Sequence, residues 1–329
     1  MYSDEDLDAA VEEGIFSSTA VQQFRDYART TSETPRVDEE NFRLISGFND
    51  IFVVIASCLL LISGAWFAST FHMAFAAITL AVISWGLSEF FVRKRRMALP
   101  AILLLISFLA GICAIPLTLS SNPDGMTILS SSILTTLFAW LHWKRFRVPI
   151  TIAAASAVVI TVVLYFGLST YPSLSQWLQP LLFTSGFLLF VFAMYWDSLD
   201  QTRKTKNSDV AFWLHLVAAP LIVHPIFFSL GILNGQTDLL GIGIVITLYI
   251  FLTIISLAVD RRAIMVSSLG YVLYAFTSLF QTYGFVSYSF ALTGICIGAS
   301  LLLLSAFWHI SRAKILNLLP HNIKKHLPI

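Results

Sequence analysis

Charged residues are scarce in this sequence. Only 12% of its 329 residues are Asp, Glu, Lys or Arg, whereas 57% are apolar and the mean hydropathy is +0.79. Soluble domains usually carry about 25% charged residues. This shortage of charge excludes an ordinary soluble domain and indicates an integral membrane protein.

Cysteine is also rare, and the three residues, Cys58, Cys113 and Cys296, lie in separate apolar segments. Thiols scattered in this way form no disulfide framework, so the sequence implies no oxidising compartment. The acidic N-terminus lacks the basic region and the apolar core of a cleavable signal peptide. We therefore expect no signal peptide.

Recognisable catalytic motifs are missing. The sequence contains no HExxH, nucleophile elbow or phosphate-binding loop, and no pair of intramembrane aspartates. Membrane enzymes usually gather several ionisable groups, which these apolar segments do not offer. We therefore expect a protein that is not an enzyme, with no catalytic residues, no cofactor, no metal and no nucleic-acid partner.

What the sequence has in abundance is long apolar segments. A helix needs roughly 17–25 apolar residues to cross a bilayer, and short links such as 69–72 force neighbouring helices to run antiparallel. The sequence predicts an all-α fold, a polytopic membrane helix bundle of about ten transmembrane helices. The expected spans are 51–69, 73–92, 99–119, 126–143, 149–168, 177–196, 210–231, 239–259, 263–281 and 285–308.

The basic residues orient this bundle. Clusters of Lys and Arg follow the even-numbered spans, at 93–96, 144–147, 203–206 and 260–262, and more follow the last span. The links after odd-numbered spans contain neither Lys nor Arg. By the positive-inside rule, both termini lie in the cytoplasm of a multi-pass protein of the plasma (inner) membrane.

The acidic residues are concentrated at the N-terminus, because residues 1–50 contain 12 of the 19 Asp and Glu. SDEDLDAAVEEG and SSTAVQQFRDYA are typical of two short helices, which we expect to form a small cytoplasmic hairpin before an interfacial helix within 38–50. So small a core is marginal alone. The hairpin is therefore expected to pack on a cytoplasmic protein partner, a second copy or the bundle, although the acidic run also fits a simple solvated face.

The C-terminal tail, KILNLLPHNIKKHLPI, mixes apolar with basic residues. We expect it to lie on the inner leaflet, where anionic lipid headgroups attract lysine. The predicted domains are therefore the acidic hairpin and interfacial helix (1–50), the ten-span bundle in the lipid bilayer (51–309) and the basic amphipathic tail (310–329).

A family resemblance accompanies the N-terminal helices. The spacing of apolar and small residues within 7–27, together with the many compact spans, resembles that of bacterial multi-spanning membrane proteins of a domain-of-unknown-function class. The resemblance implies the topology and no activity. Span one departs from that class, because GFNDIFVVIASC replaces a glycine-rich opening. The matching residues are Leu7, Glu13, Gly14, Ile15, Phe16, Ser17, Ala20, Phe24 and Tyr27.

Glu89 is the single acid inside an expected span. Arg93 lies four residues further along the same helix, a spacing that favours a structural ion pair. Ionisable residues within a membrane are functional candidates by default, so a gating or proton-handling role for Glu89 is the alternative.

His215 and His224 lie in the segment FWLHLVAAPLIVHP. Nine residues turn a straight helix by about 900°, which puts the two rings on opposite faces. Pro220 and Pro225 lack amide hydrogens and predict a kink or break near mid-membrane, as transporters use around substrates. The alternatives are hydrogen bonds to a neighbouring helix or a freed carbonyl, a transport or proton site, and a metal or haem site.

Other polar and small residues follow helical spacings. Ser267, Tyr271, Tyr274, Ser278 and Gln281 form one stripe along span nine, which either joins helices or lines a cavity. Small residues in span four (130–136) and Gly294-x-x-x-Gly298 in span ten predict close-packed seams. The pair Asp197 and Asp200 predicts interfacial ion pairs with the following Arg203 and Lys204.

Two functional classes fit these observations. The shortage of intramembrane charge favours a scaffold or sensor whose hairpin binds cytoplasmic partners. The alternative is a small-solute transporter or exporter of two five-span halves, for which His215, His224, Glu89, Ser267, Tyr271 and Tyr274 are the candidate pathway or ligand-binding residues.

Overall fold

The computed structural model describes residues 4–31, 48–200, 205–231, 239–282 and 289–318, together with Pro320, and in this part of the chain every regular element is a helix. The chain divides into two units, Met1–Asn41 and Phe42–Ile329. Most of the predicted interfacial helix and the end of the predicted tail lie outside the described residues.

The first unit contains α1 (Asp4–Glu12) and α2 (Ser18–Thr31). The Arg25 guanidinium donates a hydrogen bond to the Asp8 carboxylate at 2.9 Å. Val21 is buried, whereas the apolar side chain of Phe24 is 56% exposed.

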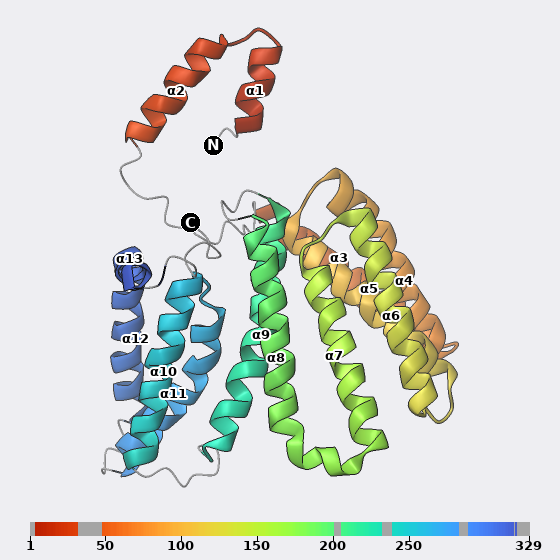
Figure 1. Ribbon diagram of the computed structural model, residues 1–329. Coiled ribbons are helices and arrows are strands. Elements are labelled where there is room, and N and C mark those ends of the chain that lie inside the picture. Colours follow the sequence, from red (N-terminus) through yellow and green to blue (C-terminus); the bar gives the residue numbers. More distant parts are fainter. Residues whose placement is uncertain are drawn as a thin grey trace. The chain divides into compact units, whose positions relative to one another are not determined.

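The second unit is a bundle of long helices joined by short links (Figure 1). Its elements are α3 (Phe48–Ser69), α4 (Met73–Ser88), the π-helical turn η1 (Glu89–Lys94), α5 (Ala98–Leu119), α6 (Gly125–Phe146), α7 (Ile150–Thr170), the 3-10 helix η2 (Pro172–Trp177), α8 (Leu178–Ser198), α9 (Lys206–Ser229), α10 (Leu239–Val259), α11 (Ala263–Thr282), α12 (Ser289–Ala306) and α13 (Trp308–Leu318).

Seven helices of the described residues are long and apolar enough to cross a membrane, and the number is up to 8 if α12 and α13, bent by 71°, count as one span. In α10 and α11 the apolar stretches that count toward a span, Gly243–Val259 and Ala263–Thr277, are shorter than in these seven helices. The structure therefore supports a multi-pass helical membrane protein, with fewer qualifying spans than the ten predicted.

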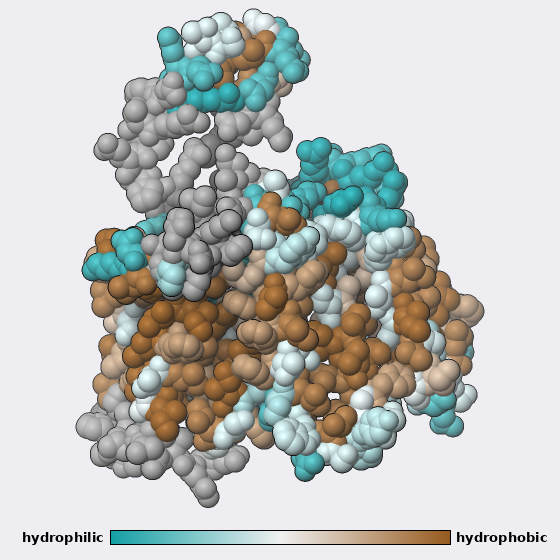
Figure 2. All heavy atoms as spheres, in the orientation of Figure 1, coloured by the Kyte–Doolittle hydropathy of each residue, from teal (hydrophilic) through white to brown (hydrophobic). Residues whose placement is uncertain are grey.

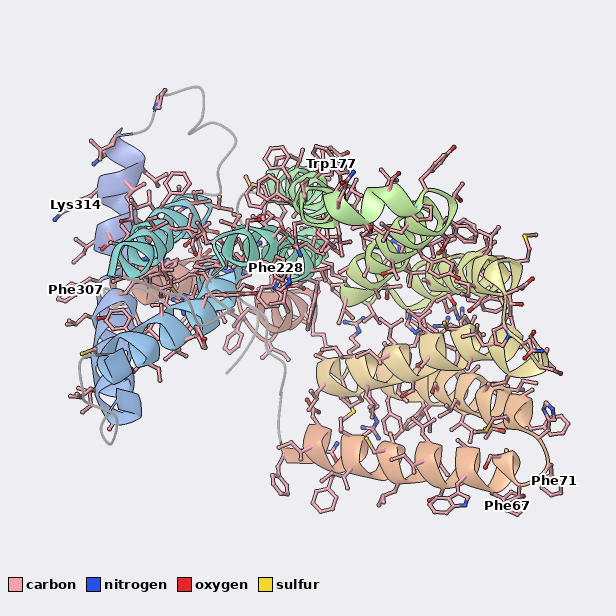
Figure 3. The ribbon with its side chains drawn as sticks, turned by 90° about the horizontal axis from the view of Figure 1, so that it is seen from below. Phe67, Phe71, Trp177, Phe228, Phe307 and Lys314 are labelled. Atoms are coloured by element: carbon pink, nitrogen blue, oxygen red, sulfur yellow. The ribbon has the colours of Figure 1, made fainter. Side chains whose placement is uncertain are left out.

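The surface of the bundle matches this setting. Brown, apolar spheres cover the visible face, and hydrophilic residues gather at one end, over the links that carry Arg and Lys (Figure 2). We call this the basic end. Phe67 and Phe71 project outward at the edge beside α3, and Trp177 projects from η2 (Figure 3). Such exposed aromatic residues suit a lipid surface and its interface.

Two helices, α5 and α9, organise the packing. The α4–α5 and α8–α9 contacts are the most extensive, and α9 also packs against α7 and α11. Glycine allows both close approaches. A Cβ at Gly111 of α5 would lie 2.7 Å from the Ala77 carbonyl oxygen, and one at Gly186 of α8 would lie 2.7 Å from the Leu221 Cβ.

The predicted glycine seam in α12 is not used within the described structure. A Cβ at Gly294 or Gly298 would meet no atom within 4 Å. The predicted seam in α6 is real at one position, where the Ser131 hydroxyl donates to the Cys113 carbonyl of α5 at 2.6 Å. A small residue thus marks a seam only where a neighbouring helix meets that face.

Candidate functional site

Two of the most deeply buried charged residues of the described bundle form an ion pair at its basic end. Asp197 lies near the end of α8, and Arg261 lies in the link between α10 and α11. The Arg261 Nη2 donates to Oδ1 of Asp197, and its Nε donates to Oδ2 at 3.3 Å. The side chains are only 2% and 0% exposed. Two parallel hydrogen bonds fix the planar guanidinium against the carboxylate.

His215 of α9 completes this cluster, because its Nε2 lies 3.0 Å from Oδ2 of Asp197. Arg261 also donates to the backbone carbonyl oxygen of Ser208 at 3.1 Å and to its hydroxyl at 3.2 Å. The polar cluster Asp197–Ser208–His215–Arg261 therefore connects α8, the start of α9 and the α10–α11 link. Removing two charges from water costs several kcal/mol for each ion, and these hydrogen bonds offset that cost.

The same link is held from its other side by α13. Asp260 has a left-handed φ of 60° and accepts a hydrogen bond from Trp308 Nε1 at 2.8 Å. The Arg312 Nε lies 3.6 Å from the same carboxylate. Ser256 of α10 donates to the Arg261 carbonyl oxygen at 2.6 Å, which closes the turn.

The sequence identified His215 but not its partners. It predicted that Asp197 pairs with Arg203 and Lys204, which lie outside the described residues. The structure instead pairs Asp197 with Arg261, 64 positions further along the chain. The only available signal was that DRR (260–262) directly follows an apolar segment of the same orientation as the segment ending at Asp197.

His224 makes a separate contact, with Tyr271 of α11, at 2.6 Å between Nδ1 and the hydroxyl oxygen. Phe227 stacks on the same tyrosine ring at 4.6 Å. The two histidines thus reach α8 and α11 respectively and do not share a ligand. The predicted alternative of hydrogen bonds to neighbouring helices describes both.

The prediction of a break in this segment is wrong, because α9 runs without interruption from Lys206 to Ser229 through Pro220 and Pro225. Each proline removes one hydrogen bond and crowds one carbonyl. Neighbouring helices surround α9 and stabilise it as one element. Its lower half diverges from α8 toward α11 (Figure 1).

The polar stripe of α11 is only partly inside the bundle. The buried positions of this helix include Ser268, Val272 and Ala275, whereas Tyr274 is 38% exposed and Ser267 is half-buried. Tyr271 lies at the edge of the buried face and alone among the described stripe residues meets another candidate, His224. The side chains of Ser278 and Gln281 lie outside the described ones.

Glu89 lies far from these groups along the chain and makes its own ion pairs. It accepts from Arg145 Nε at 2.7 Å and Nη2 at 3.0 Å, and from Arg93 Nη1 at 3.3 Å. The predicted Arg93 pair is present, but the sequence missed Arg145. The Glu89 side chain is 33% exposed, so this ion pair lies outside the buried core.

These two ion pairs repeat one arrangement. Glu89 follows α4 and meets an arginine near the end of α6, and Asp197 ends α8 and meets an arginine just after α10. Each arginine uses Nε and Nη2 against the two carboxylate oxygens. In both cases an acid at the end of one helix pairs with an arginine at or just after the end of the next-but-one helix, α4 with α6 and α8 with α10. These pairs connect the helices at the basic end.

His142 of α6 is a buried polar residue that the sequence did not single out. It is 0% exposed, and neither of its ring nitrogens has a hydrogen-bond partner in the described structure. Aromatic rings enclose it, with centroids of Trp85, Phe108 and Phe146 at 6.0, 5.6 and 4.6 Å. Edge and tilted contacts of this kind treat the imidazole as one more aromatic ring.

Within the described residues, no group of three or more His, Cys, Asp or Glu side chains could hold a metal ion. Comparison with protein families, curated proteins and solved structures finds no match. The N-terminal resemblance therefore stays a prediction, and the functional argument depends on the chain's own residues.

Proposed function

We propose that this chain is a non-enzymatic scaffold or sensor of the plasma (inner) membrane, crossing it ten times with both termini in the cytoplasm. In this proposal the N-terminal hairpin binds a cytoplasmic protein partner, and the basic tail lies on anionic lipid. The observation that carries it is the closed polar cluster of Asp197, Ser208, His215 and Arg261. The polar groups of this cluster bond to one another across three elements and do not line a route for a solute through the bundle.

The N-terminal unit supplies the interaction surface in this proposal. It presents Ile15 and Phe16 in the link between α1 and α2, and Phe24 on α2, with exposed fractions of 63%, 50% and 56%, next to the acidic residues of α1. Exposed apolar side chains within a polar surface are typical of protein-binding sites. The expected partner surface is therefore apolar at its centre and basic around it.

Photocrosslinking tests this interaction directly. A photoreactive phenylalanine analogue at position 24 of the full chain should give a discrete adduct in cells, and the same analogue at the lipid-facing position 163 should give none with a cytoplasmic protein. Deleting residues 1–41 should leave the bundle inserted in the membrane. If positions 15, 16 and 24 all give no protein adduct, the hairpin is not the interaction module.

Small-solute transport is the second candidate function, favoured by the contact of His224 with Tyr271 on the proline-containing α9. If a water-filled pathway runs along α9, we expect it to pass Leu216 and Leu221, because Pro220 and Pro225 have no N–H to bond the carbonyls of these two residues. In a variant lacking the three native cysteines, a membrane-impermeant thiol reagent should then label cysteines placed at 216 and 221.

The scaffold proposal predicts the opposite outcome at these positions. A cysteine at Asn122, in an exposed link, serves as the labelled control, and one at Val163, on the apolar surface, serves as the unlabelled control. Labelling at 216 and 221 comparable to that at 122 would favour transport. Reporter fusions at the two termini test the proposed orientation separately.

A further inference from the structure

A cavity lies at the basic end, between the link after η1, the link after α6 and the start of α9. The cavity has a volume of about 490 Å³ and combines cations with apolar walls such as Val92, Phe146 and Trp213. No acid lines it. Its positively charged residues are Arg93, Arg96, Arg145, Arg147 and Lys206.

Backbone geometry directs two of these cations. Arg96 and Arg147 each follow the end of a helical segment, and both have a φ of 53°. A residue other than glycine is uncommon in this left-handed region, and such strain persists where the surrounding structure fixes it. The two links thus turn back in the same way and bring both arginines to the cavity.

The charge of the cavity is only partly balanced. Glu89 accepts hydrogen bonds from Arg93 and Arg145. Among the described acids, Asp209 interacts electrostatically with Lys206, and none forms an ion pair with Arg96. Arg147 makes a cation–π contact at 5.6 Å with Trp143. Five cations with fewer acids beside them repel one another, and an anion between them reduces that repulsion.

Helix ends add to the positive potential. Met97 and Ala98 begin α5 at the cavity, and Pro149 and Ile150 begin α7 there. Neither helix has a side-chain hydrogen bond at its N-cap. The first N–H groups of a helix lack partners within that helix and carry partial positive charge, which favours anions.

We propose that this cavity binds a phosphate group. Arginine forks match phosphate oxygens bidentately, and the cavity has room for a headgroup. Arg145 also lines an apolar groove of about 650 Å³ between α4 and α6, together with Trp85, Phe108 and Leu141. A phospholipid could place an acyl chain in that groove, whereas a soluble phosphate would use the cavity alone. This inference does not depend on the choice between scaffold and transporter.

Ligand-induced thermal stabilisation of the full-length chain in detergent tests this site. The probes are inorganic phosphate, water-soluble dihexanoyl phosphatidic acid, and dihexanoyl glycerol as the probe without phosphate. The double variant Arg96→Gln/Arg147→Gln removes two cavity cations. Its matched control, Lys94→Gln/Arg95→Gln, removes the same charge from the end of η1 and the link after it, but neither residue lines the cavity.

We expect a phosphate-bearing probe to stabilise the wild type and the control variant, and the dihexanoyl glycerol to have no effect. The apparent Kd of the stabilising phosphate-bearing probe should rise on the order of tenfold or more in Arg96→Gln/Arg147→Gln, because charge-assisted hydrogen bonds are lost. The ratio of apparent Kd values is measured for variants whose unliganded Tm and elution volume match the wild type.

The two sources of phosphate give different patterns. Stabilisation by phosphatidic acid alone identifies a lipid headgroup, and comparable stabilisation by inorganic phosphate identifies a soluble ligand. The proposal is overturned if no phosphate probe stabilises the wild type at millimolar concentration, or if the control variant loses affinity as much as the cavity variant. If Arg96→Gln/Arg147→Gln fails to fold, the same apparent Kd is measured in Lys206→Gln, which removes one cavity cation and should also weaken binding of the phosphate probe.

Discussion

The carboxylate of Asp197 and the guanidinium of Arg261 meet inside the bundle although the two residues are 64 positions apart. The contact joins the end of α8 to the link between α10 and α11, and His215 adds α9 to the same carboxylate. Three elements that are not all neighbours in the sequence therefore depend on one acid. This dependence leads to the first prediction.

Asp197→Ala should lower the free energy of unfolding by about 3–5 kcal/mol, because it leaves Arg261 buried without its counterion. Arg261→Met should cost a similar amount. The double variant Asp197→Leu/Arg261→Met should recover most of this loss, since replacing both charges by apolar groups is often neutral or stabilising. Denaturant unfolding in detergent measures all three.

Glu89→Gln is the matched control for that series. Its carboxylate also binds an arginine through two hydrogen bonds but is 33% exposed. Exposed ion pairs contribute only about 0–1 kcal/mol. An equal loss of stability in Glu89→Gln and Asp197→Ala would contradict the argument that burial makes the difference.

The contact between His224 and Tyr271 gives a second prediction. Tyr271→Phe removes the hydroxyl, keeps the ring stacked on Phe227, and should lower stability by about 1 kcal/mol. Tyr274→Phe is the control, because that side chain is 38% exposed and no hydrogen bond to His224 connects it. A double-mutant cycle with His224→Phe measures the coupling free energy between the two side chains. Additive effects of the two substitutions would contradict a stabilising hydrogen bond between His224 and Tyr271.

The close helix approaches give a third prediction. Gly186→Ala places a Cβ 2.7 Å from the Leu221 Cβ and should cost about 1–3 kcal/mol through overpacking. Gly111→Ala should behave similarly against α4. Gly294→Ala meets no atom within 4 Å and should be neutral or slightly stabilising, because alanine favours helix over glycine. The three Tm values, compared in one detergent, check this order.

The sequence predicted the helices well, because long apolar segments and short links leave few other possibilities in a bilayer. It also predicted the pair of Glu89 with Arg93, which needs only helical spacing. It could not predict Arg145 or Arg261 as partners, since 56 and 64 positions separate them from their acids. Which links meet at the basic end depends on tertiary packing, and no local pattern records it.

The seams and the prolines show the same limit. Gly294-x-x-x-Gly298 has the spacing of a packing motif but meets no neighbour, whereas Gly186 has no such motif and lies against Leu221. Pro220 and Pro225 predicted a kink or a break, and α9 runs through both prolines without a break. In each case the local residue sets what is permitted, and the neighbouring helix decides what occurs.

The buried imidazole of His142 gives the last prediction. Its ring lies among Trp85, Phe108 and Phe146 with neither nitrogen hydrogen-bonded in the described structure. Burying a polar group without a partner costs about 1–3 kcal/mol, so His142→Phe should be neutral or stabilising if the ring is only a packing element. His215→Phe should instead destabilise, because Asp197 loses a hydrogen bond.

The comparison of these two histidine variants separates packing from function. A His142→Phe protein that unfolds at the same or a higher temperature, and still inserts normally, confirms the aromatic role. A His142→Phe protein that is as unstable as His215→Phe would mean that the imidazole nitrogens contribute to the fold. Both variants replace an imidazole by a phenyl ring at a site that is 0% exposed, so the difference between them reports the polar contact of His215 with Asp197.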